Sequence, residues 1–119
     1  MSDGLEHCGA VIIVFAMEGC PYCDDYQPKL DYEIKRFKQA GAPIFYYRGG
    51  VIPPHTIPVL VLDGASDDPQ ISALADQHQV TGMPTTLLLR RYDRPIKLEG
   101  DQDDRQIYDL LVAACHANT

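Results

Sequence analysis

Two cysteines, Cys20 and Cys23, are separated by Pro21 and Tyr22 and preceded by Gly19. Because residues three apart lie on the same face of a helix, the two sulfurs could meet and form a disulfide without rearranging the backbone. A cysteine in the first turn of a helix also faces the positive end of the helix dipole, which favours the reactive thiolate over the thiol. This spacing therefore indicates reversible thiol-disulfide chemistry.

An apolar strand and an amphipathic helix flank this motif. Residues 10–16 form a continuous apolar, β-branched run, which is typical of a central strand covered on both faces. Pro21 suits the first helical position, where its missing N–H is not needed. Pro28 is predicted to kink the helix, and residues 41–43 to end it. Its apolar positions recur with helical spacing at Tyr26, Leu30, Ile34 and Phe37.

The second half of the chain alternates strand and helix signals. Strand composition occurs at 44–47, 57–63, 85–89 and 96–98. Asp68 followed by Pro69 predicts a helix start, because a capping carboxylate precedes a proline at the first helical position, and this helix is expected to end near Gln79. A last helix is predicted over 103–116. Its apolar stripe consists of Ile107, Leu110, Leu111, Ala114 and Cys115.

The composition indicates one globular domain over residues 1–119, with 45% apolar residues. Lys and Arg number 10 against 17 Asp and Glu, and the net charge of −7 argues against a nucleic-acid or anionic membrane surface. The acidic N-terminus and the short apolar run 10–16 match neither a secretory signal nor a membrane span. We therefore expect a cytoplasmic monomer.

A zinc site is the alternative interpretation of Cys20 and Cys23. It would need a second pair of ligands, and neither candidate pair has the usual ligand spacing. These candidates are Cys8 with His7 and Cys115 with His116. We therefore predict redox chemistry and no bound metal. Cys115 falls on the apolar stripe of the last helix, which indicates a buried, inert thiol.

The predicted order of elements around the C-x-x-C motif resembles the thioredoxin superfamily. Pro28, five residues after Cys23, is similar to the helix-kinking proline of thioredoxins, and Gly100 to the glycine after their last strand. Residues Gly82-Met83-Pro84-Thr85 resemble the cis-proline loop. The resemblance covers about residues 10–116. It implies an α/β three-layer sandwich with a mixed sheet of four or five strands and helices on both faces.

Residues 44–57 are the part that this resemblance explains least, and we treat them as an insertion. Glycine and proline pairs within them predict a hairpin-like excursion. Thioredoxin proper begins with an extra strand and helix, for which the residues before 10–16 leave no room. We expect residues 44–48 to supply the missing edge strand by pairing antiparallel with 58–62.

The resemblance also assigns roles around the cysteines. Cys20, exposed at the helix start, would attack a substrate disulfide, and Cys23 would resolve the mixed disulfide that forms. Pro21, Tyr22, Met83 and Pro84 would contact the substrate, with the Met83 backbone pairing to an extended substrate chain. These roles imply an enzyme, a thiol-disulfide oxidoreductase that reduces protein disulfides and holds no resident cofactor. Its electrons would come from a reductase or from glutathione.

The motif combines features of two branches of the superfamily. Pro21-Tyr22 is similar to the dipeptide of dithiol glutaredoxins, whereas Met83-Pro84 followed by threonine is closer to thioredoxin. Val14 stands where thioredoxins carry a buried acid, and Met17 where glutaredoxins carry a lysine that holds glutathione. The usual helpers of both branches are therefore absent from these two positions.

Nearby charges should weaken the activation of Cys20. Glu18, Asp24 and Asp25 surround the motif with negative charge, which disfavours a thiolate and opposes the helix terminus. We expect the pKa of Cys20 to be less depressed than in a basic glutaredoxin site.

Two alternative functions remain open. A glutathione-dependent glutaredoxin, with glutathione as co-substrate, is favoured by Pro21-Tyr22 and by the acidic run 101–104, which could hold the amino group of glutathione. A partner-binding module built on the same fold is the other alternative, and residues 44–57 are the feature that could serve it.

Overall fold

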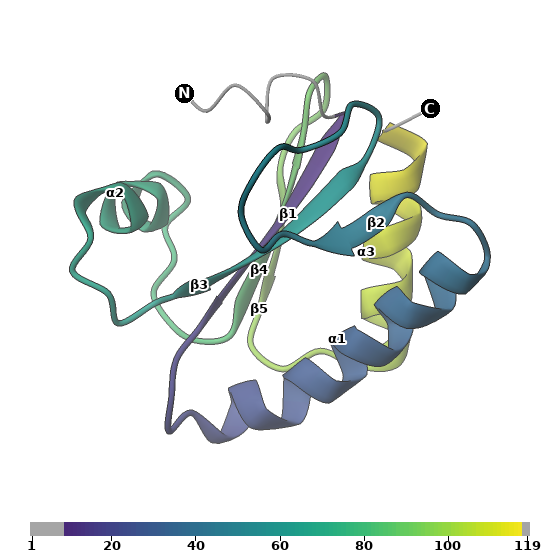
Figure 1. The fold of residues 1–119 in the computed structure, drawn as a ribbon. Coiled ribbons are helices and arrows are strands. Elements are labelled where there is room, and N and C mark those ends of the chain that lie inside the picture. Colours follow the sequence, from purple (N-terminus) through teal and green to yellow (C-terminus); the bar gives the residue numbers. More distant parts are fainter. Residues whose placement is uncertain (1–8, 118–119) are drawn as a thin grey trace.

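The computed structural model of the chain describes residues 9–117, and within them every predicted strand and helix is present (Figure 1). The elements run in the order β1 (Ala10–Ala16), α1 (Pro21–Gln39), β2 (Ile44–Tyr46), β3 (Ile57–Asp63), α2 (Pro69–Gln77), β4 (Thr85–Arg90), β5 (Ile96–Glu99) and α3 (Asp104–Ala117).

The strands form one mixed sheet in the order β2-β3-β1-β4-β5. The central strand β1 pairs parallel with β3 and antiparallel with β4, and β5 continues the sheet antiparallel to β4. The apolar run of β1 is continuous because the strand has a neighbour on each side and a covered surface on each face. The predicted mixed sheet is thereby confirmed, with five strands.

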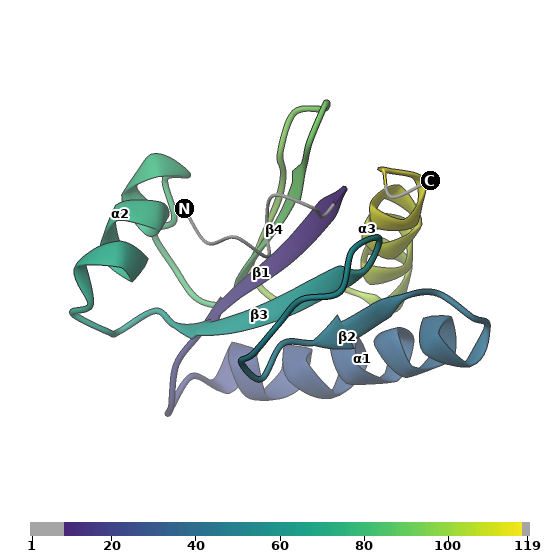
Figure 2. The same cartoon turned by 45° about the horizontal axis from the view of Figure 1, so that its top comes forward.

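Two hydrophobic clusters lie on opposite faces of the sheet. Ala10, Ile12 and Val14 of β1 pack in a cluster with residues of α1 and α3. The alternate residues Val11, Ile13 and Phe15 pack in a second cluster, which α2 joins through partly buried side chains. Figure 2 shows α1 and α3 on one side of the sheet and α2 on the other. The helices therefore cover both faces, as the resemblance implied.

Proline and aspartate define the helix starts as predicted. The Asp68 carboxylate accepts a hydrogen bond of 2.8 Å from the Gln70 N–H at the start of α2, and Pro69 occupies the first turn. In α1, Pro21 occupies the first turn, and the helix continues through Pro28. The kink predicted at Pro28 stays a prediction.

The direction predicted for the edge strand was wrong. Residues of 44–48 do form the edge strand β2, but β2 pairs parallel with β3, with Ile44 opposite Ile57. Residues 47–56 return the chain to the end of the sheet at which β2 begins. As a result β3 runs in the same direction as β2, and no hairpin forms. Ile52 in this connection is buried against the second cluster, which fixes the loop on the sheet. Strand composition alone could not distinguish this return loop from a hairpin.

Candidate redox-active site

The cysteine motif lies where β1 ends and α1 begins. Gly19 has a φ of 74°, a left-handed conformation that glycine adopts without steric cost, and it turns the chain out of the strand. Cys20 follows with extended backbone angles as the N-cap of α1. The turn therefore places the first cysteine at the helix terminus that the sequence predicted.

Cys20 and Cys23 are joined by a disulfide, and their Cα atoms are 5.2 Å apart. This separation lies within the ordinary range for disulfides, as expected for residues three apart at a helix start. The sulfur of Cys20 also accepts a hydrogen bond of 3.1 Å from the backbone N–H of Cys23. After reduction, the same amide and the helix dipole would favour a thiolate at Cys20.

The predicted exposure of Cys20 was wrong. Its relative exposure is 5%, close to the 6% of Cys23. The carbonyl oxygen of Met83 lies 3.7 Å from the Cys20 sulfur, so the Met83 loop covers part of it. Tyr22, in contrast, is 65% exposed between the two cysteines. Tyr22 is therefore far more accessible than either cysteine.

The loop before β4 brings a second segment to the cysteines, 63 residues further along the chain. The peptide bond between Met83 and Pro84 is cis. The Pro84 carbonyl accepts a hydrogen bond of 2.8 Å from the N–H of Gly100, which has a φ of 83° after β5. One continuous region of the structure therefore contains four residues that the sequence analysis singled out separately, namely Cys20, Met83, Pro84 and Gly100.

Two hydroxyl groups lie near Val14, the position at which thioredoxins carry a buried acid. Val14 is buried, and its partner across the sheet in β4 is Thr86. The Thr86 hydroxyl lies 2.7 Å from the hydroxyl of Tyr26, three residues after Cys23. Burial raises the pKa of Tyr26, so this hydroxyl stays protonated. Neutral groups rather than a carboxylate thus supply the buried polarity between α1 and β4.

Two carboxylates of the acidic run 101–104, the predicted contact for glutathione, have structural roles. Asp101 forms an ion pair of 2.7 Å with Lys29 of α1, and this contact raises the pKa of Lys29. Asp103 exchanges two hydrogen bonds with Gln106, the N-H of each residue donating to the side chain of the other, and so caps α3. Two of the acidic groups are therefore already engaged within the chain.

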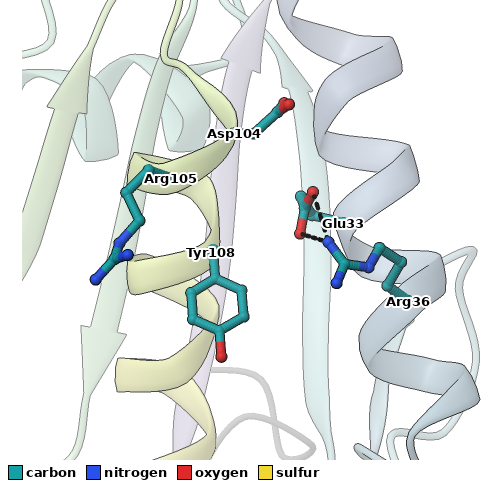
Figure 3. Close-up of a pocket in the computed structure, with 5 residues that line it drawn as sticks. All are labelled: Glu33, Arg36, Asp104, Arg105 and Tyr108. Carbon is teal, nitrogen blue, oxygen red and sulfur yellow. Dashed lines mark hydrogen bonds and ion pairs between the residues drawn. The ribbon is translucent and has the colours of Figure 1, made fainter.

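A separate open groove lies between α1 and α3 (Figure 3). The Glu33 carboxylate in it is nearly buried and faces Arg36 at 3.4 Å. Asp104, Arg105 and Tyr108 complete the lining. Glu33 is thirteen residues beyond Cys20, which corresponds to about 20 Å along the helix. The groove is therefore remote from the cysteines. Its buried charge was missed because glutamate is normally exposed, although residue 33 adjoins the apolar stripe of α1.

The free thiol Cys115 lies at the end of α3 and is half-buried rather than fully buried. Burial raises its pKa, which keeps it a neutral thiol. Among residues 9–117, no three His, Cys, Asp or Glu side chains gather in a way that could hold a metal ion. The zinc candidates Cys8 and His7 lie outside the described residues. No helix in the described part is long and apolar enough to cross a membrane.

No protein-family model matches the chain, and no curated protein matches it in sequence. Solved structures do match it in fold. A mutant thioredoxin from Halobacterium salinarum NRC-1 is 20% identical with a TM-score of 0.63, and the match covers 95% of this chain and 80% of that one. Mitochondrial thioredoxin 3 from Saccharomyces cerevisiae, in its oxidized form, is 17% identical with a TM-score of 0.60, over 91% and 82% of the two chains.

Chloroplastic thioredoxin z is 13% identical, with a TM-score of 0.62 over 93% of this chain and 82% of its own. At these identities the comparison shows the fold alone. The chain has a thioredoxin-like fold, with a cysteine pair of the redox type at the start of α1.

Proposed function

We propose that the chain is a thiol-disulfide oxidoreductase that reduces protein disulfides through Cys20 and Cys23. The observation that supports this most directly is the disulfide between them at the N-terminus of α1, with the Met83 carbonyl 3.7 Å from Cys20. A pair that closes there without backbone rearrangement can cycle between dithiol and disulfide.

The reaction runs in two exchanges. The Cys20 thiolate attacks one sulfur of the substrate disulfide, a mixed disulfide forms, and the other substrate sulfur leaves as a thiolate that takes up a proton. The Cys23 thiol then loses its proton and attacks Cys20, which releases the second substrate sulfur. Two electrons pass from the chain to the substrate, and the chain ends with the Cys20–Cys23 disulfide seen in the structure. An external dithiol reductase or two molecules of glutathione would restore the dithiol.

The residues around the sulfur suit an extended polypeptide. Met83 precedes β4 and keeps its carbonyl beside Cys20, where a substrate strand could pair with the backbone of the loop. Tyr22 offers an exposed ring and Pro21 an exposed apolar surface next to Cys20 in the motif. Pro84, buried behind Met83, holds the position of this loop.

The surroundings favour protein disulfides over glutathione. Met17, at the position of a glutathione-binding lysine, is an exposed apolar side chain. Asp101 is paired with Lys29, and Asp103 caps α3, so both carboxylates already have partners within the chain that the amino group of glutathione would have to compete with. The glutaredoxin alternative keeps one supporting observation, the Pro21-Tyr22 dipeptide inside the motif.

Two coupled assays test the proposal. We expect turnover of insulin disulfides with NADPH and thioredoxin reductase, and little turnover of a glutathione mixed disulfide with glutathione reductase. Cys20→Ser should reduce the insulin rate to background, because the attacking thiolate is gone. Cys115→Ser is the matched control, since it removes a thiol at the far end of another helix, and it should keep the wild-type rate.

Turnover of the glutathione substrate alone would support the glutaredoxin alternative. If cells that carry Cys20→Ser in place of the wild-type chain show no defect, the thiol is not needed and a docking module would be supported instead. Residues 44–57 would then be the surface to examine next. Either result would contradict the proposal.

A further inference from the structure

Gly64 follows the last residue of β3 and lies beside the end of the central strand. Its N–H donates a hydrogen bond of 2.8 Å to the carbonyl of Ala16, which continues the pairing of Ala16 with Asp63 by one residue. Ala16 ends β1 four residues before Cys20. The backbone of Gly64 is therefore fixed close to the strand that leads into the cysteine motif.

The side chain of Met83 fills the space where a side chain at Gly64 would be. A methyl group at Gly64 would overlap the Met83 Cε and Sδ atoms and would lie 3.3 Å from its Cγ. The other glycines between residues 19 and 100 differ, because a methyl group on any of them would meet nothing within 4 Å. Gly64 is thus the glycine of this range whose missing side chain makes room for a neighbour.

The backbone conformation at position 64 does not require a glycine. Gly64 is absent from the residues with a left-handed φ, which include Gly19 and Gly100. An alanine could therefore adopt its backbone angles, and the conflict would fall on the flexible end of Met83. The requirement at position 64 is for space.

An added methyl group would turn the Met83 side chain outward. On its inner side, Met83 packs against the cluster that contains Ile13, Phe15 and Leu87, and these side chains are buried. A densely packed interior does not accept a displaced thioether without strain. The side chain would therefore move toward solvent, on the loop whose Met83 carbonyl lies 3.7 Å from the Cys20 sulfur.

We propose that Gly64 is a specificity-determining residue of the cysteine site. It seats the Met83 side chain against the end of β3, and this keeps the surface beside Cys20 open for the residues that flank the disulfide of a protein substrate. The inference rests on the proposed function and extends it, because it names a positioning residue that acts through Met83 and lets the site admit bulky substrates.

Gly64→Ala tests this inference with two substrates of different size. For insulin disulfides, we expect KM to rise about tenfold, because a displaced side chain excludes part of the substrate. For a small aromatic disulfide such as dithiobisnitrobenzoate, we expect the rate to change less than about twofold, because Cys20 itself is untouched. Ala65→Ser, which adds one atom at an exposed neighbour, should leave both rates unchanged.

A second comparison separates a clash with Met83 from general damage. In the Met83→Ala background, the side chain that needs the space is gone, so Gly64→Ala should have no further effect on KM. Equal losses for both substrates, or an unchanged KM for insulin in Gly64→Ala, would overturn the inference while leaving the proposed function intact. A wild-type chain that reduces neither substrate would contradict the proposed function, and the inference with it.

Discussion

The reactivity of Cys20 depends on two opposing influences at the residue scale. The N–H of Cys23 and the start of α1 stabilise negative charge on its sulfur. Glu18, Asp24 and Asp25, all exposed around the motif, oppose that charge. Solvent screens the exposed carboxylates more than it screens a capping amide in direct contact. We therefore expect an activated thiol with a moderate pKa.

The pH dependence of alkylation distinguishes the two kinds of cysteine in the described chain. In the reduced protein, Cys20 should react with iodoacetamide with a midpoint between about pH 5 and pH 8.5. Cys115 should react only at higher pH, because burial disfavours its thiolate and raises its pKa above that of a solvent-exposed thiol. Peptide mass mapping after timed alkylation reads each site separately. A Cys20 midpoint well below pH 5, or Cys115 reacting first at neutral pH, would contradict this assignment.

At the scale of elements, the site depends on how α1 is held against β4. The Tyr26 hydroxyl on α1 and the Thr86 hydroxyl on β4 form a buried hydrogen bond of 2.7 Å. Tyr26 follows Cys23 by three residues, and Thr86 follows Pro84 by two, so this contact joins the cysteine helix to the strand behind the Met83 loop. The ion pair of Lys29 with Asp101 joins α1 to the segment after β5.

Removal of one hydroxyl from this contact should destabilise the fold. Thr86→Val leaves the buried Tyr26 hydroxyl without its partner, and we expect a loss of about 1–3 kcal/mol in the free energy of unfolding. Adding Tyr26→Phe removes the hydroxyl that Thr86→Val leaves without a partner, so the double variant should be more stable than Thr86→Val alone. Urea unfolding of the reduced proteins measures both. If the two losses simply add, the hydrogen bond is not the source of the effect.

At the scale of the whole molecule, local signals were sufficient for much of the fold. The apolar run of β1, the Asp68-Pro69 start of α2 and the stripe of α3 each depend on neighbours within a few residues, and each is present as predicted. The resemblance then placed these elements in one mixed sheet.

The features that the sequence did not predict depend on contacts between distant segments. The direction of β2 depends on how residues 47–56 return along the sheet, and the burial of Cys20 depends on the Met83 loop. The need for a glycine at position 64 follows from its contact with the Met83 side chain, which only the folded structure shows. In sequence, a glycine after a strand indicates an ordinary turn. The fold was therefore more predictable than the detailed shape of the site.

Capture of a mixed disulfide tests the central claim most directly. In Cys23→Ser, Cys20 can attack a substrate disulfide but no residue resolves the product, so the covalent complex should accumulate. We predict that reduced Cys23→Ser, mixed with insulin, gains the mass of one intact insulin molecule, because a single exchange opens only one of the two bonds between the insulin chains, and that non-reducing peptide mapping locates the new bond at Cys20. The same measurement on Cys20→Ser should show no adduct. An adduct at another cysteine, or none in Cys23→Ser, would contradict the assignment of Cys20 as the attacking thiol.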